Sequence, residues 1–107
     1  MGFGTGMSEP GLEPVRVGAG VETPELLHRV EPVYPPDAVA ARVVGTVVVE
    51  ATVDERGQVQ AVKVLNSIGP LDQAAIDAVM QWRYRPLLVN EQPSQFILTV
   101  NVSFRLH

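Results

Sequence analysis

The side chains able to do chemistry in this 107-residue sequence are few and widely spaced. Its two histidines are His28, which follows a glycine-rich stretch, and His107, the last residue. Exposure to solvent explains both better than a role as metal ligand or general base. Cysteine is absent, which excludes a disulfide framework, a thiolate nucleophile and a cysteine-ligated metal.

The carboxylates and serines do not form a catalytic pattern either. Asp72 and Asp77 are five residues apart, so they do not share a helix face, and they are typical of a helix start and a solvated stripe. Residues 54–57 (DERG) begin like a calcium loop but lack the later ligand positions, which favours a hairpin turn. Ser67 lacks the first glycine and the partner base of a nucleophile elbow. We therefore predict no enzyme activity, no cofactor and no metal.

Charge gives weaker indications of partners. Eight basic and twelve acidic residues leave a net charge of −4, which argues against nucleic acid. Arg83, Arg85 and Arg105 are expected to gather at one end of the fold, as a solvated rim or as a site for an acidic partner. No apolar run approaches the roughly 20 residues that span a bilayer, and no signal peptide is visible. Any membrane anchor is expected outside this chain.

One helix organises the elements, and the spacing predicts it from Leu71 to about Arg83 or Tyr84, before Pro86. Its apolar face is mostly alanine and ends at the single tryptophan, Trp82. Such a helix needs a sheet to cover. Alternating residues predict strands over residues 46–54, 58–66 (with a bulge near residue 60 or 61) and 96–106, and residues 54–57 form the first turn.

The remaining segments are shorter. Residues 1–20 hold six of the nine glycines and are predicted to be a flexible linker, with a weak extended piece at residues 15–17; residues 21–107 form the domain. Residues 22–30 are a brief helix or an extended arm. Residues 37–43 form a short helix after the proline-rich residues 31–36, and residues 90–93 form a polar loop.

The predicted fold class is therefore α+β: a three-stranded antiparallel sheet, one main helix packed on one face and a short N-terminal helix. An open sheet has edges that expose unpaired N–H and C=O groups. The final strand is long, alternating and free of proline, and Arg105 near its end is its only charge. It is expected to accept an added strand from a partner peptide, a function that needs no catalytic side chain.

An ordered set of residues in this chain resembles the C-terminal domain family of TonB, from about Glu31 to Leu106. The set is Pro32-Val33-Tyr34-Pro35, Gly45 with its valine-rich strand, Asp54 to Gly57 followed by Val59, Leu71-Asp72 with Ala74-Ala75, Trp82-Arg83-Tyr84 with Pro86, and a terminal strand ending in Phe104. The resemblance implies a non-catalytic periplasmic domain of an inner-membrane-anchored energy transducer. Such a domain transmits energy derived from the proton-motive force to outer-membrane transporters, which take up substrates such as siderophores.

The resemblance also implies partners and contact residues. The TonB box, a short transporter segment, would pair with the last strand, and the segment before the Tyr-Pro pair would touch the transporter. An ExbB/ExbD-type motor would act through an N-terminal region absent from this chain, and a homodimer is a further expected partner. The alternative is a self-associating structural or sensory periplasmic module whose edges pair with each other. The expected partner-binding residues are Glu31, Pro32, Val33, Tyr34, Phe96, Ile97, Leu98, Thr99, Val100, Asn101 and Val102.

Overall fold

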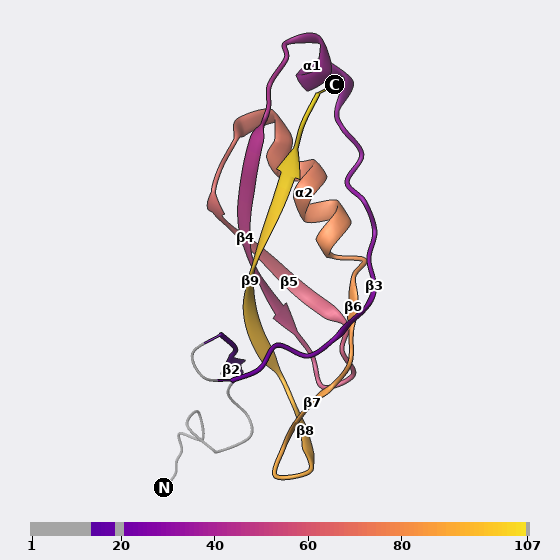
Figure 1. Cartoon of the computed structure of the whole chain (residues 1–107), viewed down its shortest axis with the longest axis vertical. Helices are drawn as coiled ribbons and strands as arrows, with labels where there is room; N and C mark the ends of the chain where they lie inside the picture. The colour runs from indigo at the N-terminus through magenta and orange to yellow at the C-terminus, as the bar shows by residue number, and fades with distance from the viewer. Residues whose placement is uncertain (1–13, 19–20, 107) are drawn as a thin grey trace, which may run out of the picture.

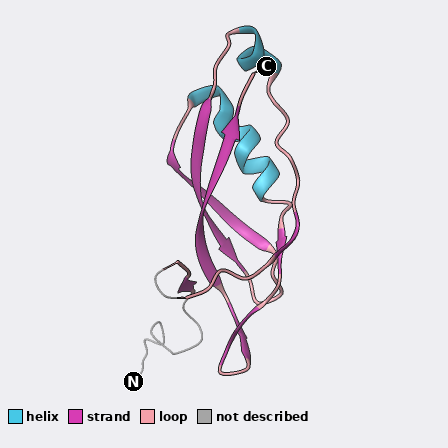
Figure 2. Cartoon of the chain, viewed as in Figure 1, coloured by secondary structure: helices cyan, strands magenta, loops and turns pink. Residues whose placement is uncertain are grey.

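A computed structural model describes residues 14–18 and 21–106 and shows an antiparallel sheet with a helix across one face (Figures 1 and 2). Its long strands are β4 (Gly45–Val53), β5 (Val59–Asn66) and β9 (Phe96–Phe104). β4 lies in the centre and pairs antiparallel with both others. The predicted α+β class and the three antiparallel strands are confirmed. A fourth, very short strand, β2 (Val15–Arg16), pairs parallel with β9 and was expected only as a weak extended piece.

Alternation places one side of every long strand in the core. Val47, Val49, Ala51 and Val53 of β4 are fully buried, and the five alternate residues of β9 from Phe96 to Phe104 are buried beside them. On β5 the register shifts between Thr52↔Ala61 and Val53↔Val59. One extra residue therefore stands at Gln60, where the sequence predicts a bulge.

The main helix is shorter than its apolar pattern predicts. A 3-10 turn, η1 (Gly69–Leu71), leads into α2 (Asp72–Val79), and the Asp72 carboxylate accepts hydrogen bonds from the Ile68 N–H (2.7 Å) and the Ser67 hydroxyl. Leu71, Ala75, Ala78 and Trp82 are buried as predicted. The expected end near residue 83 or 84 is wrong.

A tightened turn at Gln81 and Trp82 follows the helix, and the chain after Trp82 pairs as a strand instead of continuing helical. β6 (Arg83–Tyr84) lies antiparallel to β3 (Leu26–His28), and the Tyr84 N–H donates to the Gly57 carbonyl at 2.8 Å. A helical Tyr84 would lose both contacts. This pairing also settles residues 22–30 as an extended arm.

Two local elements complete the description. The short helix α1 (Pro36–Ala40) buries Ala38 and ends three residues before the predicted residue 43, and a turn follows it at residues 41–42. The expected polar loop at residues 90–93 is wrong, because β7 (Leu87–Val89) and β8 (Gln92–Ser94) form a hairpin. Its two-residue turn, Asn90-Glu91, has φ values of 52° and 67°, as a type I′ turn requires.

Candidate partner-binding edge

The free side of β9 can be identified from its hydrogen bonds to β2. The Val15 and Val17 N–H groups donate to the carbonyls of Gln95 (2.8 Å) and Ile97 (3.0 Å). Backbone groups alternate along a strand, so odd-numbered residues of β9 point toward this edge and even-numbered residues point toward β4. Beyond β2, the N–H and C=O groups of Thr99, Asn101 and Ser103 therefore face outward. No other strand of the described chain pairs with them.

β2 covers the beginning of the same edge. Val15 is opposite Phe96 and Arg16 is opposite Ile97. Phe96 and Ile97 were expected to be available to a partner strand, but their backbone edge is already occupied in this structure. The available edge is Leu98 to Phe104.

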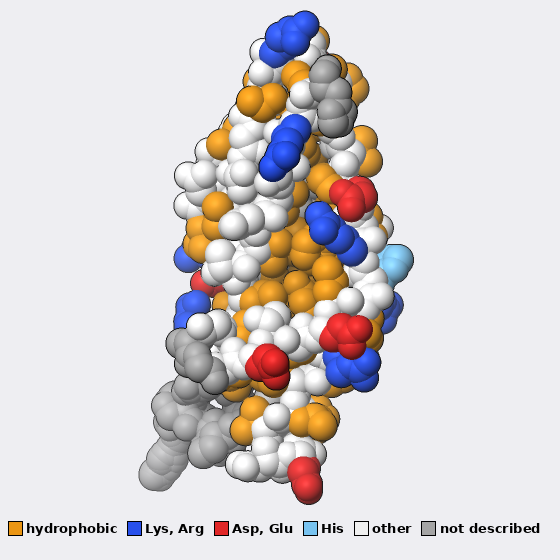
Figure 3. Space-filling view, viewed as in Figure 1, with side chains coloured by type: hydrophobic (Ala, Val, Ile, Leu, Met, Phe, Trp, Pro, Cys, Tyr) orange, Lys and Arg blue, Asp and Glu red, His pale blue; other side chains and the backbone are white. Residues whose placement is uncertain are grey.

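Apolar surface lies beside this edge. Figure 3 shows hydrophobic side chains gathered in the middle of one face, between β9 and the extended arm that runs from β3 towards α1, with basic and acidic side chains around them. Leu98 and Val100 of β9 retain slight exposure there, 8% each, and Val30 and Leu26 of the arm are only partly buried. A strand added to β9 would lay alternate side chains on this surface.

The second expected segment, Glu31 to Tyr34, lies mainly along α2. The Trp82 indole N–H donates to the Val30 carbonyl (2.9 Å), and this bond fixes the arm across the end of the helix. Only Tyr34 reaches β9: its ring meets Phe104 edge-on, with centroids 5.3 Å apart, and its hydroxyl donates to the Val43 carbonyl. The segment from Glu31 to Tyr34 therefore contacts β9 through the rings of Tyr34 and Phe104.

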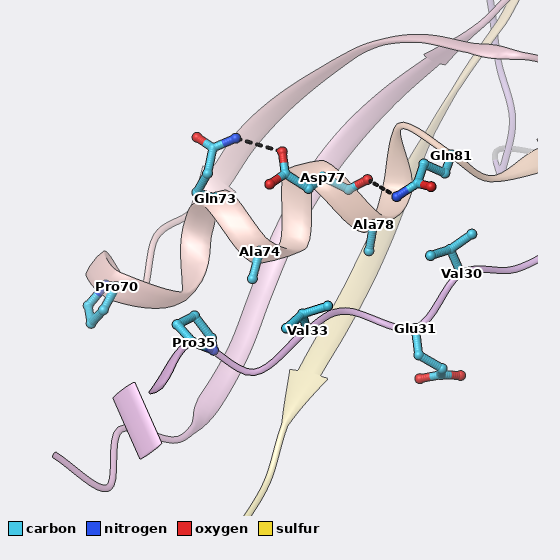
Figure 4. A pocket seen from close by; sticks show the side chains of 10 residues that line it. All are labelled: Val30, Glu31, Val33, Pro35, Pro70, Gln73, Ala74, Asp77, Ala78 and Gln81. Carbon is cyan, nitrogen blue, oxygen red and sulfur yellow. Dashed lines mark hydrogen bonds between the residues drawn. The ribbon is translucent and has the colours of Figure 1, made fainter. Parts of the chain in front are cut away.

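Glu31, Pro32 and Val33 themselves run past a groove instead of along β9. Figure 4 shows the groove, which holds about 360 Å³ between this arm and the polar side of α2. Val33 is 78% exposed, and the Glu31 carboxylate pairs with the exposed Arg29 guanidinium at 3.4 Å. Their surface is free to touch a partner that approaches from the side of α2.

Tyr84 is the titratable group that the fold perturbs most clearly. Burial raises its pKa from 10.0 to about 12, and the Arg29 guanidinium acts in the opposite direction. The Tyr84 ring packs edge-on against Phe96, with centroids 5.7 Å apart. Tyr84 has a structural role at the base of β9, and its environment suits a neutral phenol.

The other side chains considered for chemistry have local structural roles. The Asp54 carboxylate accepts the N–H groups of Arg56 and Gln58, both at 2.9 Å, and so builds the hairpin turn. Asp77 accepts a hydrogen bond from Gln73 (2.8 Å) on the wet side of α2. His28 is exposed on β3, and His107 lies outside the described residues.

The three arginines do not gather at one end, so that expectation is wrong. Arg83 forms an isolated bridge with Gln58, beside the β4–β5 turn, and Arg85 pairs with Glu25 at 3.0 Å. Arg105 follows the opposite end of β9, next to Phe104 and Gly45.

Among residues 14–18 and 21–106, no three His, Cys, Asp or Glu side chains are grouped to hold a metal ion. Within the same residues, no helix has the length and apolar character needed to cross a membrane. What the described part of the chain does offer is an unpaired strand edge.

The two groups that the sequence analysis did not identify are Arg16 and Glu50, whose ion pair (3.0 Å) connects β2 to β4. The sequence feature that could have indicated β2 is the alternation of apolar and charged residues in Val15-Arg16-Val17.

Together, the antiparallel sheet, the helix across one of its faces and the unpaired part of its last strand define a small α+β domain with a free strand edge. Comparison with known proteins gives the family. The sequence profile described as "Gram-negative bacterial TonB protein C-terminal" matches residues 30–106, and the chain belongs to this family.

Individual relatives agree with this assignment. The chain is 32% identical over 89 residues to Protein TonB of Vibrio cholerae serotype O1, an alignment covering 80% of this chain and 36% of that protein. It is 38% identical over 78 residues to Protein TonB of Xanthomonas campestris pv. campestris strain B100, covering 71% and 35%. The chain thus spans about a third of the length of these relatives.

A solved structure shares the fold. The solution NMR structure of Pseudomonas aeruginosa TonB CTD superposes with a TM-score of 0.67 at 24% identity, covering 83% of this chain and 92% of that one. At this identity the likeness concerns the fold alone.

Proposed function

We propose that this chain is the non-catalytic periplasmic domain of a TonB-type energy transducer, anchored in the inner membrane by sequence outside this chain. It binds the TonB box of an outer-membrane transporter by strand addition to β9. An ExbB/ExbD-type motor supplies energy derived from the proton-motive force through that other sequence, and the domain passes it on for substrate uptake, including that of siderophores. Membership of the family supports the class of function.

The observation that supports strand addition is the outward backbone of Thr99, Asn101 and Ser103, which no other described strand covers. Each backbone hydrogen bond to a partner strand contributes about 1 kcal/mol net. Apolar surface beside the edge provides contacts for alternate side chains of the partner (Figure 3). The exposed Glu31 to Val33 surface supplies a second contact that fixes the direction of approach.

The test is an NMR titration of the isotopically labelled chain with synthetic peptides that copy the N-terminal segments of outer-membrane transporters of the source organism. We expect the largest amide shifts at Thr99, Asn101 and Ser103, with smaller shifts at Glu31 and Val33. Shifts that cluster on β5 or on the β7–β8 hairpin would refute the proposed site.

The same free edge also supports the alternative of self-association, in which the β9 strands of two copies pair with each other. Sedimentation across a concentration series separates the two proposals. A stable dimer that no peptide dissociates would favour a structural or sensory module, because the dimer covers the edge that a box peptide needs.

A further inference from the structure

β2 uses the backbone groups that a partner strand would use. Its N–H groups at Val15 and Val17 bond the outward carbonyls of Gln95 and Ile97, in the same row as Thr99, Asn101 and Ser103. A partner paired along the whole of β9 would need the positions that β2 now holds. The two strands are therefore mutually exclusive at Phe96 and Ile97.

An ion pair holds β2 in this position. Arg16 is opposite Ile97 on β9, while Glu50 is on β4 opposite Thr99, so the arginine side chain passes over β9 to reach the carboxylate at 3.0 Å. Arg16 is 68% exposed and Glu50 is 20% exposed. An exposed pair of this kind is weak and screened by salt, so it can hold a strand without locking it.

The chain leaves β9 immediately after this contact. Gly18 has a φ of +104°, and its N–H bonds the Val21 carbonyl at 3.0 Å, which turns the chain away before Thr99. A hollow of about 470 Å³ lies at this point, between Arg16, Val17, Gly18 and Thr23 on one side and residues 97–99 on the other. A partner strand that starts at Ser103 therefore meets the end of β2 after only three outward-facing residues.

We infer that β2 is an intramolecular competitor for the β9 edge, and that Arg16 occupies a site on Glu50 that a basic residue of the partner strand takes over when β2 is displaced. The inference rests on the proposed function and adds its regulation. The free chain hides the first part of the edge, so an extended partner binds with an apparent affinity reduced by the fraction of molecules in which β2 is open. A partner strand with Arg or Lys opposite Ile97 regains the ion pair; one with Asp or Glu there does not.

The experiment compares the whole chain with three variants. Arg16→Glu removes the ion pair, and Val17→Pro removes the N–H that bonds Ile97. Arg56→Glu is the matched control, since it makes the same charge change at an exposed turn residue away from β9. Hydrogen exchange of the Val15 amide reports the opening of β2 without any ligand. Isothermal titration with the synthetic transporter peptides reports competition.

We expect the Val15 amide to exchange about two- to fivefold faster in Arg16→Glu than in the parent or in Arg56→Glu, and peptide affinity to rise by about two- to fivefold in Arg16→Glu and Val17→Pro. If β2 opens faster but peptide affinity is unchanged, competition is refuted while strand addition stands. If exchange at Val15 is the same in Arg16→Glu as in the parent, the ion pair does not hold β2 and the inference is refuted. If no peptide binds the parent or any variant, the proposed function itself is refuted, and the inference about β2, which rests on it, is refuted with it.

Discussion

A proline at Asn101 tests the central proposal, because it removes a backbone donor that the fold itself does not use. Alternation along β9 directs the Asn101 N–H to the free edge, whereas its neighbours Val100 and Val102 direct theirs to Val49 and Val47 on β4. Proline is tolerated where a strand's N–H faces away from its neighbour. Asn101→Pro should therefore fold.

The expected magnitudes follow from this geometry. Stability should fall by no more than about 1 kcal/mol, the range that β-strand preferences span. Peptide binding should lose one hydrogen bond of about 1 kcal/mol and suffer from the ring that fills the approach to the edge. Since every 1.4 kcal/mol is a factor of ten, we expect affinity for a box peptide to weaken by about tenfold or more.

The assay pairs urea denaturation with peptide titration, and two variants serve as controls. Asn101→Val keeps the N–H and changes only the exposed side chain, so it should bind like the parent. Val100→Pro removes a bond to β4 and should unfold the sheet. The reasoning is refuted if folded Asn101→Pro binds the peptide as tightly as Asn101→Val does.

Three further predictions concern the supports of β9. Gly57→Ala should destabilise the fold by about 3 kcal/mol or more in urea denaturation, because φ is +87° and a Cβ there would lie 1.8 Å from the Tyr84 carbonyl oxygen; a change below about 1 kcal/mol would contradict the close approach. The free energy of unfolding should fall by up to about 2 kcal/mol as pH rises from about 10 to about 12, because the unfolded chain loses the Tyr84 proton before the folded chain does. Tyr84→Phe should remove this fall in the free energy of unfolding between about pH 10 and about 12. An unchanged fall in Tyr84→Phe would show that Tyr84 does not cause it. Trp82→Phe should cost about 1–2 kcal/mol and speed amide exchange along the arm, since it loses the bond to the Val30 carbonyl; unchanged exchange there would show that this bond does not hold the arm.

The long strands could be predicted because their apolar residues recur with the two-residue period of a strand and those same residues are buried. The two-residue alternation of β4 and β9 gave their inward faces, and the broken alternation between Val59 and Val62 gave the bulge at Gln60. The end of α2 was not predictable, because the apolar spacing continues to Trp82 while the backbone does not. After Val79 the chain tightens to i→i−3 hydrogen bonds at Gln81 and Trp82, and Tyr84 then bonds the distant Gly57 carbonyl, a contact that local spacing does not predict.

The site was predictable only at the level of the strand. The alternation and lack of proline in β9 indicated a free edge, but Phe96 and Ile97 are covered by Val15 and Arg16, which lie 81 residues away in the sequence. A two-residue strand is too short to give a periodic signal. The β7–β8 hairpin was not predicted because its turn lacks the usual sequence signal: Glu91 occupies the position where a type I′ turn normally has glycine.

The strand arrangement also indicates how the domain can carry load. β9 is a nine-residue strand paired with β4 from Gly45↔Phe104 to Val53↔Phe96, and it lies between β4 and the proposed partner. Tension along the strand axis loads these hydrogen bonds in parallel, so that they resist shear together. The partner has outward groups at Thr99, Asn101 and Ser103 only, unless it displaces β2. The interface with the partner is therefore the shorter ladder and should separate before β9 leaves β4. Under the competition proposed above, displacing β2 lengthens that ladder, so a partner that displaces β2 should be released at a higher force than one that does not.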